Sequence, residues 1–391
     1  MADVDVLISG GGPVGLCLAL LLARAGKDVL VCEAEDELTE DLRASTFHPP
    51  TLDMLETIGI DLVPEGLVCP HWQVRMHPSG ERAVFDLAVL EGETRHPYRL
   101  QCEQWKLSRL LLAALEAEPA ATVSMGCRVD NIVPQAEEVN VTLQGEIVSA
   151  RFVVGADGAR STVREAMGLA LEGETFPETT VLATTTHPFE DHLPGLSNVS
   201  YCWTDGGNFS LLKVPGRWRV SIYPQEGLTI EEAMEPEAIE AGLQRIVPRD
   251  QSYDVLECRP YRIHQRIVPT YVKGCVALAG DAAHLNSPSG GMGLNGGLHD
   301  AFELADALTA ILDGAPMDRL DLYDRRRQPI AREQILAQAG RNRARMRTKD
   351  PEKRREIMAD LQATAADRDK LKAHLLRTSM IEGLRAAERI A

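Results

Sequence analysis

Apolar runs and segments of helical period alternate at the start of the chain. Residues 4–8 and 29–32 are short, mostly apolar runs, which are typical of buried strands in a parallel sheet. Between them, residues 13–25 repeat leucine and alanine on one face, which predicts a helix that ends at Gly26. This part of the chain therefore predicts a strand–helix–strand unit.

The pattern changes in the middle of the chain. Residues 71–89 alternate in places around a Pro-Ser-Gly turn, which predicts a hairpin, and short alternating strands dominate from about 180 to 265. An apolar run within residues 122–154 and another at 274–279 return to the pattern of buried strands. The helical period predicts helices at residues 51–58, 104–117, 230–246, 296–312 and 320–339.

Composition excludes several classes of function. The 391 residues are enough for two to three domains, and the net charge of −17 argues against nucleic acid and anionic membranes as partners. Residues 319–391 carry 19 Lys and Arg against 11 Asp and Glu. For this basic segment, a packing element or a solvated helical face is favoured over a nucleic-acid arm.

The cysteines and the apolar runs indicate the compartment. None of the eight cysteines forms a C-x-x-C pair, so neither a metal site nor dithiol chemistry is expected. No secretion signal precedes the first predicted strand, and no membrane-spanning helix is expected. The expected location is the cytoplasm.

A glycine-rich turn follows the first predicted strand. Gly10, Gly12 and Gly15 have the spacing G-x-G-x-x-G, which combines a tight turn, close approach to a pyrophosphate and close helix–strand packing. The helix that follows offers free N–H groups to the phosphates. Glu33 ends the second strand, where a carboxylate binds the ribose hydroxyls of an adenosine and repels a phosphorylated ribose. The segment predicts a dinucleotide site.

Two further signatures occur far downstream. Residues 155–158 (Gly-Ala-Asp-Gly) and 280–284 (Gly-Asp-Ala-Ala-His) each follow a predicted strand. Asp281 offers two acceptor oxygens to the hydroxyls of a ribityl chain, although a helix N-cap is the alternative when it is taken alone. The glycines of residues 290–293 allow backbone N–H groups to approach a flat ring, and a helix expected to start near Gly296 would stabilise negative charge on it.

These patterns together predict an α/β fold with a Rossmann-like, mostly parallel sheet, an inserted antiparallel sheet and a helical C-terminus. The dinucleotide-binding domain is expected at residues 1–70, 100–180 and 265–318. The substrate-binding domain is expected at 71–99 and 181–264, and the helical segment at 319–391. Three glycine and aspartate signatures in this order favour a bound flavin dinucleotide.

With these motifs, roughly residues 1–340 resemble the FAD-dependent monooxygenases of the para-hydroxybenzoate hydroxylase type. The resemblance implies non-covalent FAD, NADH or NADPH as electron donor, O2 and a small aromatic substrate, in a monomer or homodimer. One oxygen atom passes from a flavin hydroperoxide to an electron-rich ring, and the other leaves as water. The FAD contacts that it implies are Gly10, Gly12, Pro13, Gly15, Glu33, Arg43, Gln104, Asp157, Gly280, Asp281, Pro288, Gly291, Gly293, Leu294 and Asn295.

The same resemblance implies that residues 288–295 wrap the flavin ring as a loop, here called the flavin loop. It places the aromatic substrate between the antiparallel sheet and this loop, in a site that excludes water. Arg219 is a candidate for binding a substrate carboxylate, with an exposed surface arginine as the alternative. His48 is a candidate base for a phenol, and Pro288 stiffens the loop where O2 reacts. Core packing is the alternative for each aromatic candidate. The candidate substrate contacts are Phe47, Tyr201, Trp203, Phe209, Leu211, Arg219 and Tyr223.

Other roles and functions remain open at this point. A structural role is favoured for His284 over a catalytic one, whereas Arg160 and Arg164 are equally suited to nicotinamide-cofactor phosphates and to structural ion pairs. The W-x-W-x-I-P signature of flavin halogenases is absent. A flavin reductase or dehydrogenase of a hydrophobic substrate is the main alternative enzyme, and a non-catalytic flavin-binding regulator is the third possibility.

Overall fold

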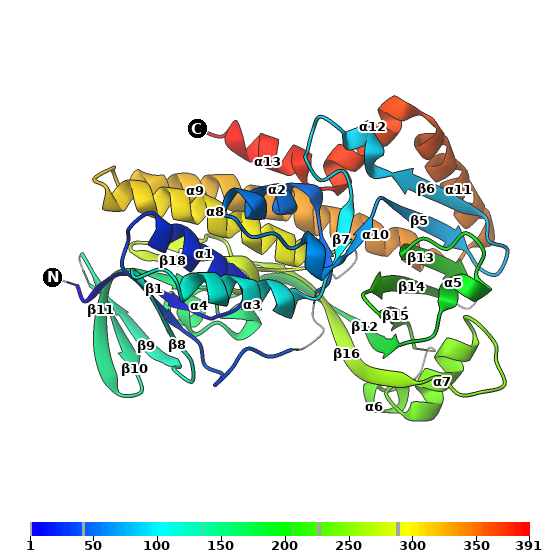
Figure 1. Ribbon diagram of the computed structural model, residues 1–391, viewed down its shortest axis with the longest axis horizontal. Coiled ribbons are helices and arrows are strands. Elements are labelled where there is room, and N and C mark those ends of the chain that lie inside the picture. Colours follow the sequence, from blue (N-terminus) through cyan, green and yellow to red (C-terminus); the bar gives the residue numbers. More distant parts are fainter. Residues whose placement is uncertain (1, 41–43, 136, 206, 225–227, 287–289) are drawn as a thin grey trace.

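Two large sheets make up the framework of the computed structural model, which describes residues 2–40, 44–135, 137–205, 207–224, 228–286 and 290–391. The first sheet occupies the left half of Figure 1. Its five central strands are parallel and run in the order β18-β11-β1-β2-β8. They are β1 (Val4–Ser9), β2 (Val29–Cys32), β8 (Ala121–Ser124), β11 (Glu146–Gly155) and β18 (Val276–Leu278), with β9 (Val129–Pro134), β10 (Val139–Leu143) and β17 (Val272–Lys273) added antiparallel.

Helices cover this parallel sheet. Helix α1 (Pro13–Arg24) begins at a proline, whose missing N–H costs nothing at the first helical position. It packs closely on α8 (Met292–Leu312), where a Cβ at Gly297 would lie 2.8 Å from the Cγ2 of Val14 in α1. The other helices beside this sheet are α2 (Pro49–Thr57), α3 (Gln104–Leu115), α4 (Thr162–Ala166) and α9 (Asp318–Ile330).

The second sheet fills the right half of Figure 1 and has the strand order β19-β16-β12-β15-β14-β13-β5-β6. All neighbours in it are antiparallel except β13 and β5. Two of its strands cross the predicted domain boundaries near 180 and 264, so those boundaries fall inside strands. The strands are β5 (His71–Met76), β6 (Arg82–Asp86), β12 (Glu172–Thr185), β13 (Val199–Thr204), β14 (Gly207–Val214), β15 (Arg217–Ile222), β16 (Val255–Ile267) and β19 (His284–Leu285).

Each face of the second sheet has its own apolar cluster. On one face, Leu211 and Val220 pack with Leu243 of helix α7. On the other face, Trp72 and Trp203 pack with residues of the C-terminal helices. The helices of the first face are α5 (Phe189–His192), α6 (Ile230–Ala233) and α7 (Pro236–Gln244). The predicted single helix at 230–246 is wrong, because Pro236 starts a new helix at its first position.

A small third sheet has the order β3-β7-β4 and contributes residues to both halves of the molecule. Its strands are β3 (Thr46–Phe47), β4 (Leu67–Cys69) and β7 (Arg99–Gln101). The core of the parallel sheet takes up Phe47 and Leu100, whereas Cys69 belongs to the cluster around Trp72 on the second sheet. Short 3-10 turns lie at Val63–Glu65, Leu87–Leu90, Gly158–Arg160 and Gly280–Ala282.

The C-terminal helices, orange to red in Figure 1, pack against the second sheet and return toward α9. They are α10 (Ala337–Arg347), α11 (Pro351–Ala366), α12 (Arg368–Thr378) and α13 (Ile381–Glu388). The expected helix at 320–339 is instead interrupted by a π-helical stretch, Ala331–Leu336, which begins two residues after Pro329. Because Met346, Met358 and Leu375 are buried against the sheet, the basic segment is a packing element.

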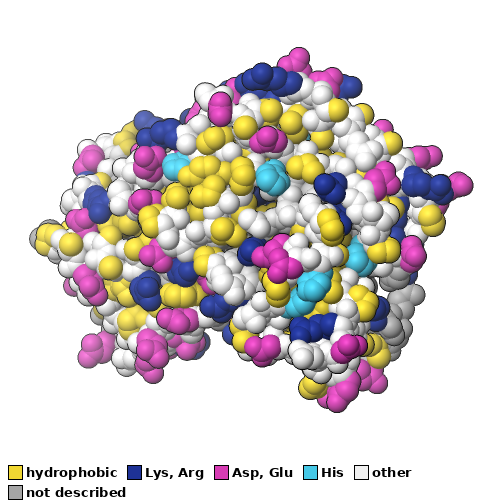
Figure 2. Space-filling model, turned by 45° about the vertical axis from the view of Figure 1, so that its right-hand side comes forward, with side chains coloured by type: hydrophobic (Ala, Val, Ile, Leu, Met, Phe, Trp, Pro, Cys, Tyr) yellow, Lys and Arg dark blue, Asp and Glu magenta, His cyan; other side chains and the backbone are white. Residues whose placement is uncertain are grey.

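Charged side chains of both signs are interspersed over the face that Figure 2 shows. None of the helices in the described part of the chain is long and apolar enough to cross a membrane.

Candidate cofactor and substrate site

Three turns meet at one edge of the parallel sheet. Gly10 follows β1, Asp157 lies two residues after β11, and Gly280 lies two residues after β18. These three strands are neighbours, with Ser9 paired to Gly155 and Gly155 paired to Leu278. The carboxyl ends of neighbouring parallel strands share an edge, which is where open α/β sheets bind their ligands. The three signatures therefore line one edge.

The glycines of the first turn are required by close backbone contacts. Gly10 has a φ of +108°, and a Cβ on it would lie 2.5 Å from the carbonyl oxygen of Ala156. A Cβ on Gly15 would lie 2.0 Å from the carbonyl oxygen of Gly10. Gly12 forms the N-cap of α1, and a Cβ on it would have no atom of the described residues within 4 Å. The open space before this helix N-terminus fits a pyrophosphate.

Glu33 is held in place by the loop that it faces. Its Oε2 accepts a hydrogen bond from the N–H of Gly11 (2.6 Å), and its Oε1 accepts one from the N–H of Glu35 (3.0 Å). Each carboxylate oxygen can accept a second hydrogen bond, so the group can still bind ribose hydroxyls. The predicted adenosine contact fits this geometry.

Asp157 has one satisfied and one free oxygen. Its Oδ2 accepts from the Ser9 hydroxyl (3.4 Å) and the Val163 N–H (3.3 Å). Its Oδ1 is buried and has no hydrogen-bond partner among the described residues, and burial raises the pKa of this carboxyl group. A buried acceptor without a donor is costly unless a ligand supplies one. The orphaned oxygen therefore fits a bound cofactor.

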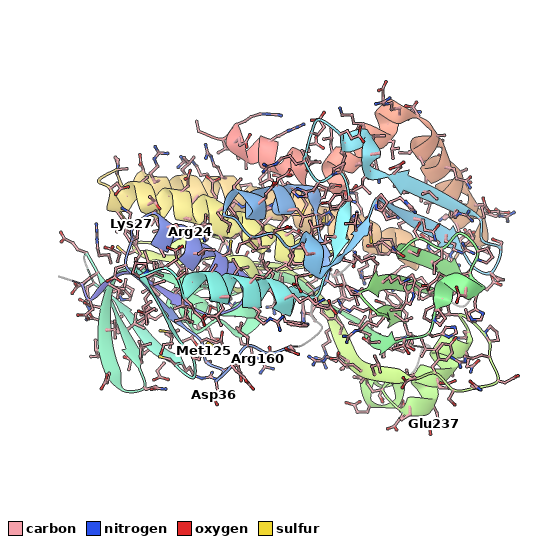
Figure 3. The ribbon with its side chains drawn as sticks, viewed as in Figure 1. Arg24, Lys27, Asp36, Met125, Arg160 and Glu237 are labelled. Carbon is pink, nitrogen blue, oxygen red and sulfur yellow. The ribbon has the colours of Figure 1, made fainter. Side chains whose placement is uncertain are left out.

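Arg164 connects the second and third signatures. Its guanidinium donates to the carbonyl oxygens of Ala159 (2.8 Å) and Ala282 (3.1 Å). The geometry favours a structural role for Arg164 over binding of nicotinamide-cofactor phosphates. The predicted structural partner was an acidic side chain, whereas the hydrogen bonds go to backbone carbonyl oxygens. Arg160 is exposed, at the lower edge of the molecule in Figure 3.

The third signature is held by a buried charge network that the sequence motifs do not reveal. Asp300 of α8 accepts from the Gly280 N–H (3.1 Å), His284 Nε2 (2.8 Å) and Arg327 Nε (2.7 Å). Asp300 and His284 are fully buried, and Arg327 is almost so. This geometry supports a structural role for His284. Asp281 itself is exposed at this turn, where its carboxylate can reach a ligand.

The loop that precedes α8 differs from the prediction at its helix start. The helix begins at Met292, after Gly291 with a φ of +67°. Its free N–H groups therefore belong to the turn that starts at Met292 and not to a turn that starts at Gly296. Gly293 and Leu294 are half-buried in that first turn. The predicted start at Gly296 is wrong because Gly291, with no Cβ, allows an earlier left-handed N-cap.

Asn295 fastens this loop to β3. Its amide donates to the carbonyl oxygens of Thr46 (2.8 Å) and Gly291 (2.6 Å), and its Oδ1 accepts from the His48 N–H (2.8 Å). The side chain is fully buried. This geometry favours a role in positioning the loop over the predicted direct contact of the Asn295 side chain with FAD.

His48 is buried beside the same loop. Its Nε2 lies 2.8 Å from the carbonyl oxygen of Gly290, so Nε2 carries the proton and donates it. Burial, reinforced by the charge of Arg99, lowers the pKa of His48 to about 3. A group this weakly basic is poorly matched to a phenol, whose pKa is near 10. The geometry argues against His48 as the substrate base.

The candidate substrate residues fall on both faces of the second sheet. Leu212 pairs with Arg219 across β14 and β15, so the neighbouring Leu211 points to the opposite face. Phe209 and Leu211 are buried with helix α7 there. The prediction that they share one substrate site with Arg219 is therefore wrong.

The remaining candidates also differ in exposure. Arg219 is buried, not exposed, and donates to the Ser45 hydroxyl (2.6 Å); burial lowers its pKa to about 10. Phe47 and Trp203 are fully buried in apolar clusters, which favours core packing for both. Tyr201 and Tyr223 are half-buried.

Of the three remaining predicted FAD contacts, the structure describes Gln104. Gln104 opens α3, is half-buried, and its N–H donates to the carbonyl oxygen of Ala44 (3.0 Å). Arg43 and Pro288 lie outside the described residues.

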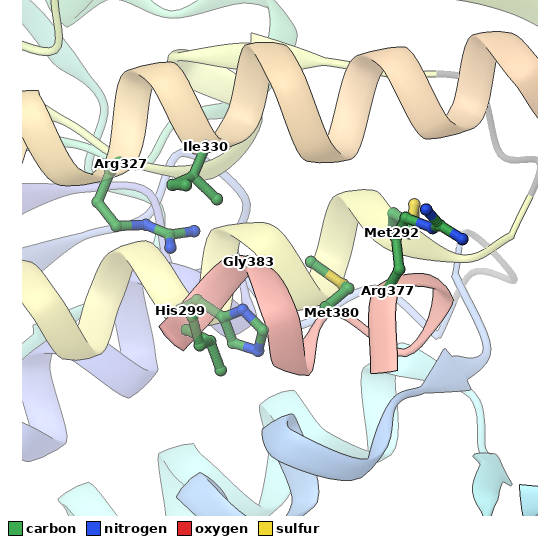
Figure 4. A pocket seen from close by; sticks show the side chains of 8 residues that line it. Met292, His299, Arg327, Ile330, Arg377, Met380 and Gly383 are labelled. Atoms are coloured by element: carbon green, nitrogen blue, oxygen red, sulfur yellow. The ribbon is translucent and has the colours of Figure 1, made fainter. Parts of the chain in front are cut away.

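A cavity under α13 is too small for an aromatic substrate. It measures about 10 Å³ and lies among side chains of α8, α9, α12 and α13, including His299, Arg327 and Met380 (Figure 4). Such a volume holds about one water molecule. This cavity therefore does not hold the aromatic substrate.

Known proteins with similar sequences identify the family to which this site belongs. Residues 3–339 match the family described as FAD binding domain. The 6-hydroxy-3-succinoylpyridine 3-monooxygenase of Pseudomonas putida (strain DSM 28022 / S16) is 36% identical over 335 residues, which are 83% of this chain and 85% of that protein. The para-nitrophenol 4-monooxygenase of Pseudomonas sp. (strain WBC-3) is 33% identical and covers 98% of this chain and 97% of its own length.

The chain belongs to the FAD-binding aromatic monooxygenases. Among solved structures, p-nitrophenol 4-monooxygenase from Pseudomonas putida DLL-E4 superimposes with a TM-score of 0.91 at 32% identity, over 98% of this chain and 99% of that one. Aklavinone-11 hydroxylase, solved with FAD and aklavinone, gives 0.79 at 27% identity, over 89% of this chain and 70% of the other. The α/β fold, FAD as the cofactor and the flavin-dependent monooxygenase class predicted from the sequence are confirmed.

Proposed function

We propose that this FAD-binding monooxygenase hydroxylates a small aromatic compound, phenolic or heteroaromatic, with NADH or NADPH as electron donor. The balanced reaction consumes the aromatic compound, NAD(P)H, a proton and O2, and gives the hydroxylated ring, NAD(P)⁺ and water. The observation that carries the proposal is the convergence of Gly10, Asp157 and Gly280 on one sheet edge, where α8 contacts the Gly280 turn. Two relatives whose names describe ring monooxygenation add support.

FAD, when bound, supplies the electron transfer from NAD(P)H and the reaction with O2. The protein supplies position and electrostatics. The free N–H groups of the first turn of α8 would stabilise negative charge on the reduced cofactor, because a helix N-terminus favours anions. Asn295 makes three hydrogen bonds, one to Thr46 of β3, one to His48 beside it and one to Gly291 within the loop, so the N–H groups are fixed before the reaction.

Water exclusion is the second task of the chain. The C-terminal helix α10 packs on β13 and β14, and Asn208 donates to the carbonyl oxygen of Met346 (3.1 Å). A Cβ on Gly290 would lie 3.0 Å from the amide nitrogen of Asn342, so α10 also lies against the flavin loop. This helix closes the substrate side of the loop against solvent, which protects a water-sensitive reaction.

Purified protein reconstituted with FAD tests the proposal. We expect NAD(P)H oxidation to accelerate when a phenolic or heteroaromatic acid is added, with O2 uptake and a product heavier by one oxygen atom. A matched reaction without O2 should reduce the flavin but give no hydroxylated product. Product formation in the absence of O2 would favour a dehydrogenase, and no response to any aromatic compound would favour a flavin-binding regulator.

A further inference from the structure

Arg99 is a buried cation whose guanidinium is only partly satisfied. It is 3% exposed, and its guanidinium carbon lies 4.9 Å from the centre of the Trp72 ring. Its Nε and Nη1 are buried and have no hydrogen-bond partner among the described residues. A cation–π contact offsets only part of the cost of removing a guanidinium from water.

Two C-terminal helices bring further N–H donors to the same place. His374 of α12 lies with its ring 4.9 Å from that of Phe85 and 6.1 Å from that of Trp72. Its Nε2 is buried and without a partner among the described residues, as is the Nε of Arg345 from α10. The Nη2 of Arg345 donates a hydrogen bond to the Oδ1 of Asn342 (3.2 Å), which is a neutral side chain.

Tyr201 joins these groups from the second sheet. Its ring lies 6.1 Å from that of Trp72, and its hydroxyl is close enough to both arginines to influence their pKa values. We call Arg99, Arg345, His374 and Tyr201 the Arg99 cluster. The four residues come from β7, α10, α12 and β13, which are far apart in the sequence.

The Arg99 cluster has no counter-ion in the described part of the chain. Burial is the main cause that lowers the pKa of Arg99 and of Arg345, and no Asp or Glu acts on either. Burial and three arginines lower the pKa of His374 to about 4. A buried cation that lacks an anion is one of the most costly arrangements in a protein. The missing partner is therefore an anion.

The cluster lies beside the flavin loop. The charge of Arg99 acts on His48, whose Nε2 bonds to the Gly290 carbonyl oxygen at 2.8 Å. Arg345 belongs to α10, the helix that packs on β13 and lies against Gly290 through Asn342. The cluster thus stands on the side of the loop where the proposed function needs an aromatic substrate.

We propose that the Arg99 cluster binds the anionic oxygen group of the substrate, a carboxylate or an oxyanion borne by the ring. The inference rests on the proposed function and specifies its substrate class as anionic aromatic compounds. Arg99 and Arg345 hold the anion, while Tyr201 and His374 donate hydrogen bonds to it. Because α10 and α12 carry two of the four groups, the C-terminal helices are part of the specificity site.

Equilibrium binding to the FAD-loaded protein tests this assignment without relying on turnover. The probes are two matched pairs, 4-hydroxybenzoate with 4-hydroxybenzamide and 4-nitrophenol with 4-nitroanisole, followed by the change in the flavin spectrum. The unmodified protein should bind the anionic member of at least one pair at least about tenfold more tightly, the size of a charged hydrogen bond. Arg345→Gln and Arg99→Gln should each remove most of that preference.

Two further variants make the result decisive. Arg347→Gln removes an exposed charge from the same helix and should keep the preference. Arg99→Lys retains the cation and should keep part of it, even if Arg99→Gln does not fold. Equal binding of charged and neutral probes, or an unchanged preference in Arg345→Gln, overturns the inference while aromatic-stimulated NAD(P)H oxidation keeps the proposed function. A protein that binds none of the four probes overturns the inference, and it overturns the proposed function too only if no aromatic compound accelerates NAD(P)H oxidation.

Discussion

The network around Asp300 gives the sharpest prediction of stability. Asp300 is fully buried, and its two oxygens accept from Arg327, His284 and the Gly280 N–H. Asp300→Ala leaves the Arg327 guanidinium buried without its anion, which costs about 3–5 kcal/mol in comparable buried pairs. We expect a fall of that size in the free energy of unfolding. FAD affinity should fall too, because the Gly280 turn loses its anchor.

The matched control is one turn further along α8. Glu303 pairs with Arg326 at 2.8 Å, but both side chains are about a quarter exposed, so Glu303→Ala should cost under about 1 kcal/mol. Urea unfolding at a fixed excess of FAD measures both variants, since bound ligand stabilises the folded state. If Asp300→Ala loses no more stability than Glu303→Ala, the buried network does not hold the cofactor edge.

Acid provides a second readout of the same network. Burial alone would raise the pKa of Asp300, but the charge of Arg327 and the hydrogen bonds from Arg327 and His284 hold it at about 2. This pKa lies well below that of an unfolded aspartate, a difference worth about 2–3 kcal/mol. The stabilisation is complete above about pH 4 and is lost as the pH falls towards 2. Asp300→Asn should be less stable at pH 7 and should lack this part of the acid dependence.

Three other substitutions separate backbone geometry from ligand contact. Gly10→Ala should weaken FAD binding at least about tenfold and also destabilise the FAD-free protein, because its Cβ would lie 2.5 Å from the Ala156 carbonyl oxygen. Gly12→Ala should weaken FAD binding alone, as no described atom crowds that position; flavin fluorescence titration and thermal unfolding of FAD-free protein compare the two. Asn295→Ala removes three buried hydrogen bonds and should cost about 2–4 kcal/mol in urea unfolding. An Asn295→Ala protein as stable as the unmodified one would contradict the clamp between the loop and β3.

The sequence could predict the parts of the site that depend on local geometry. Gly10, Gly15 and Gly291 stand where a tight turn, a close contact or a positive φ demands glycine, and such demands are visible as motifs. Helix ends were less predictable. The start of α8 depends on Gly291, which has a left-handed backbone conformation. Pro236 divides residues 230–246 into two helices, although the helical period of apolar residues continues through them.

The groups that depend on tertiary packing could not be predicted. Asp300 is a charged residue within a largely apolar helix, which the sequence shows. Its role cannot be predicted from the sequence, because only the fold places Arg327 opposite it. Phe209 and Arg219 both lie in strands whose apolar and polar residues alternate. Only the pairing of β14 with β15 shows that their side chains lie on opposite faces of the sheet. Arg99 and His374 carry no motif at all, because the fold brings them together from β7 and α12.

Incorporation of oxygen from O2 tests the central claim most directly. The FAD-loaded protein is incubated with NAD(P)H, an aromatic compound that accelerates its oxidation, and ¹⁸O2, and the product is analysed by mass spectrometry. The account predicts a hydroxylated ring that contains one ¹⁸O atom, with none incorporated when only the water is labelled. An oxidised product that carries no oxygen from O2 would contradict it.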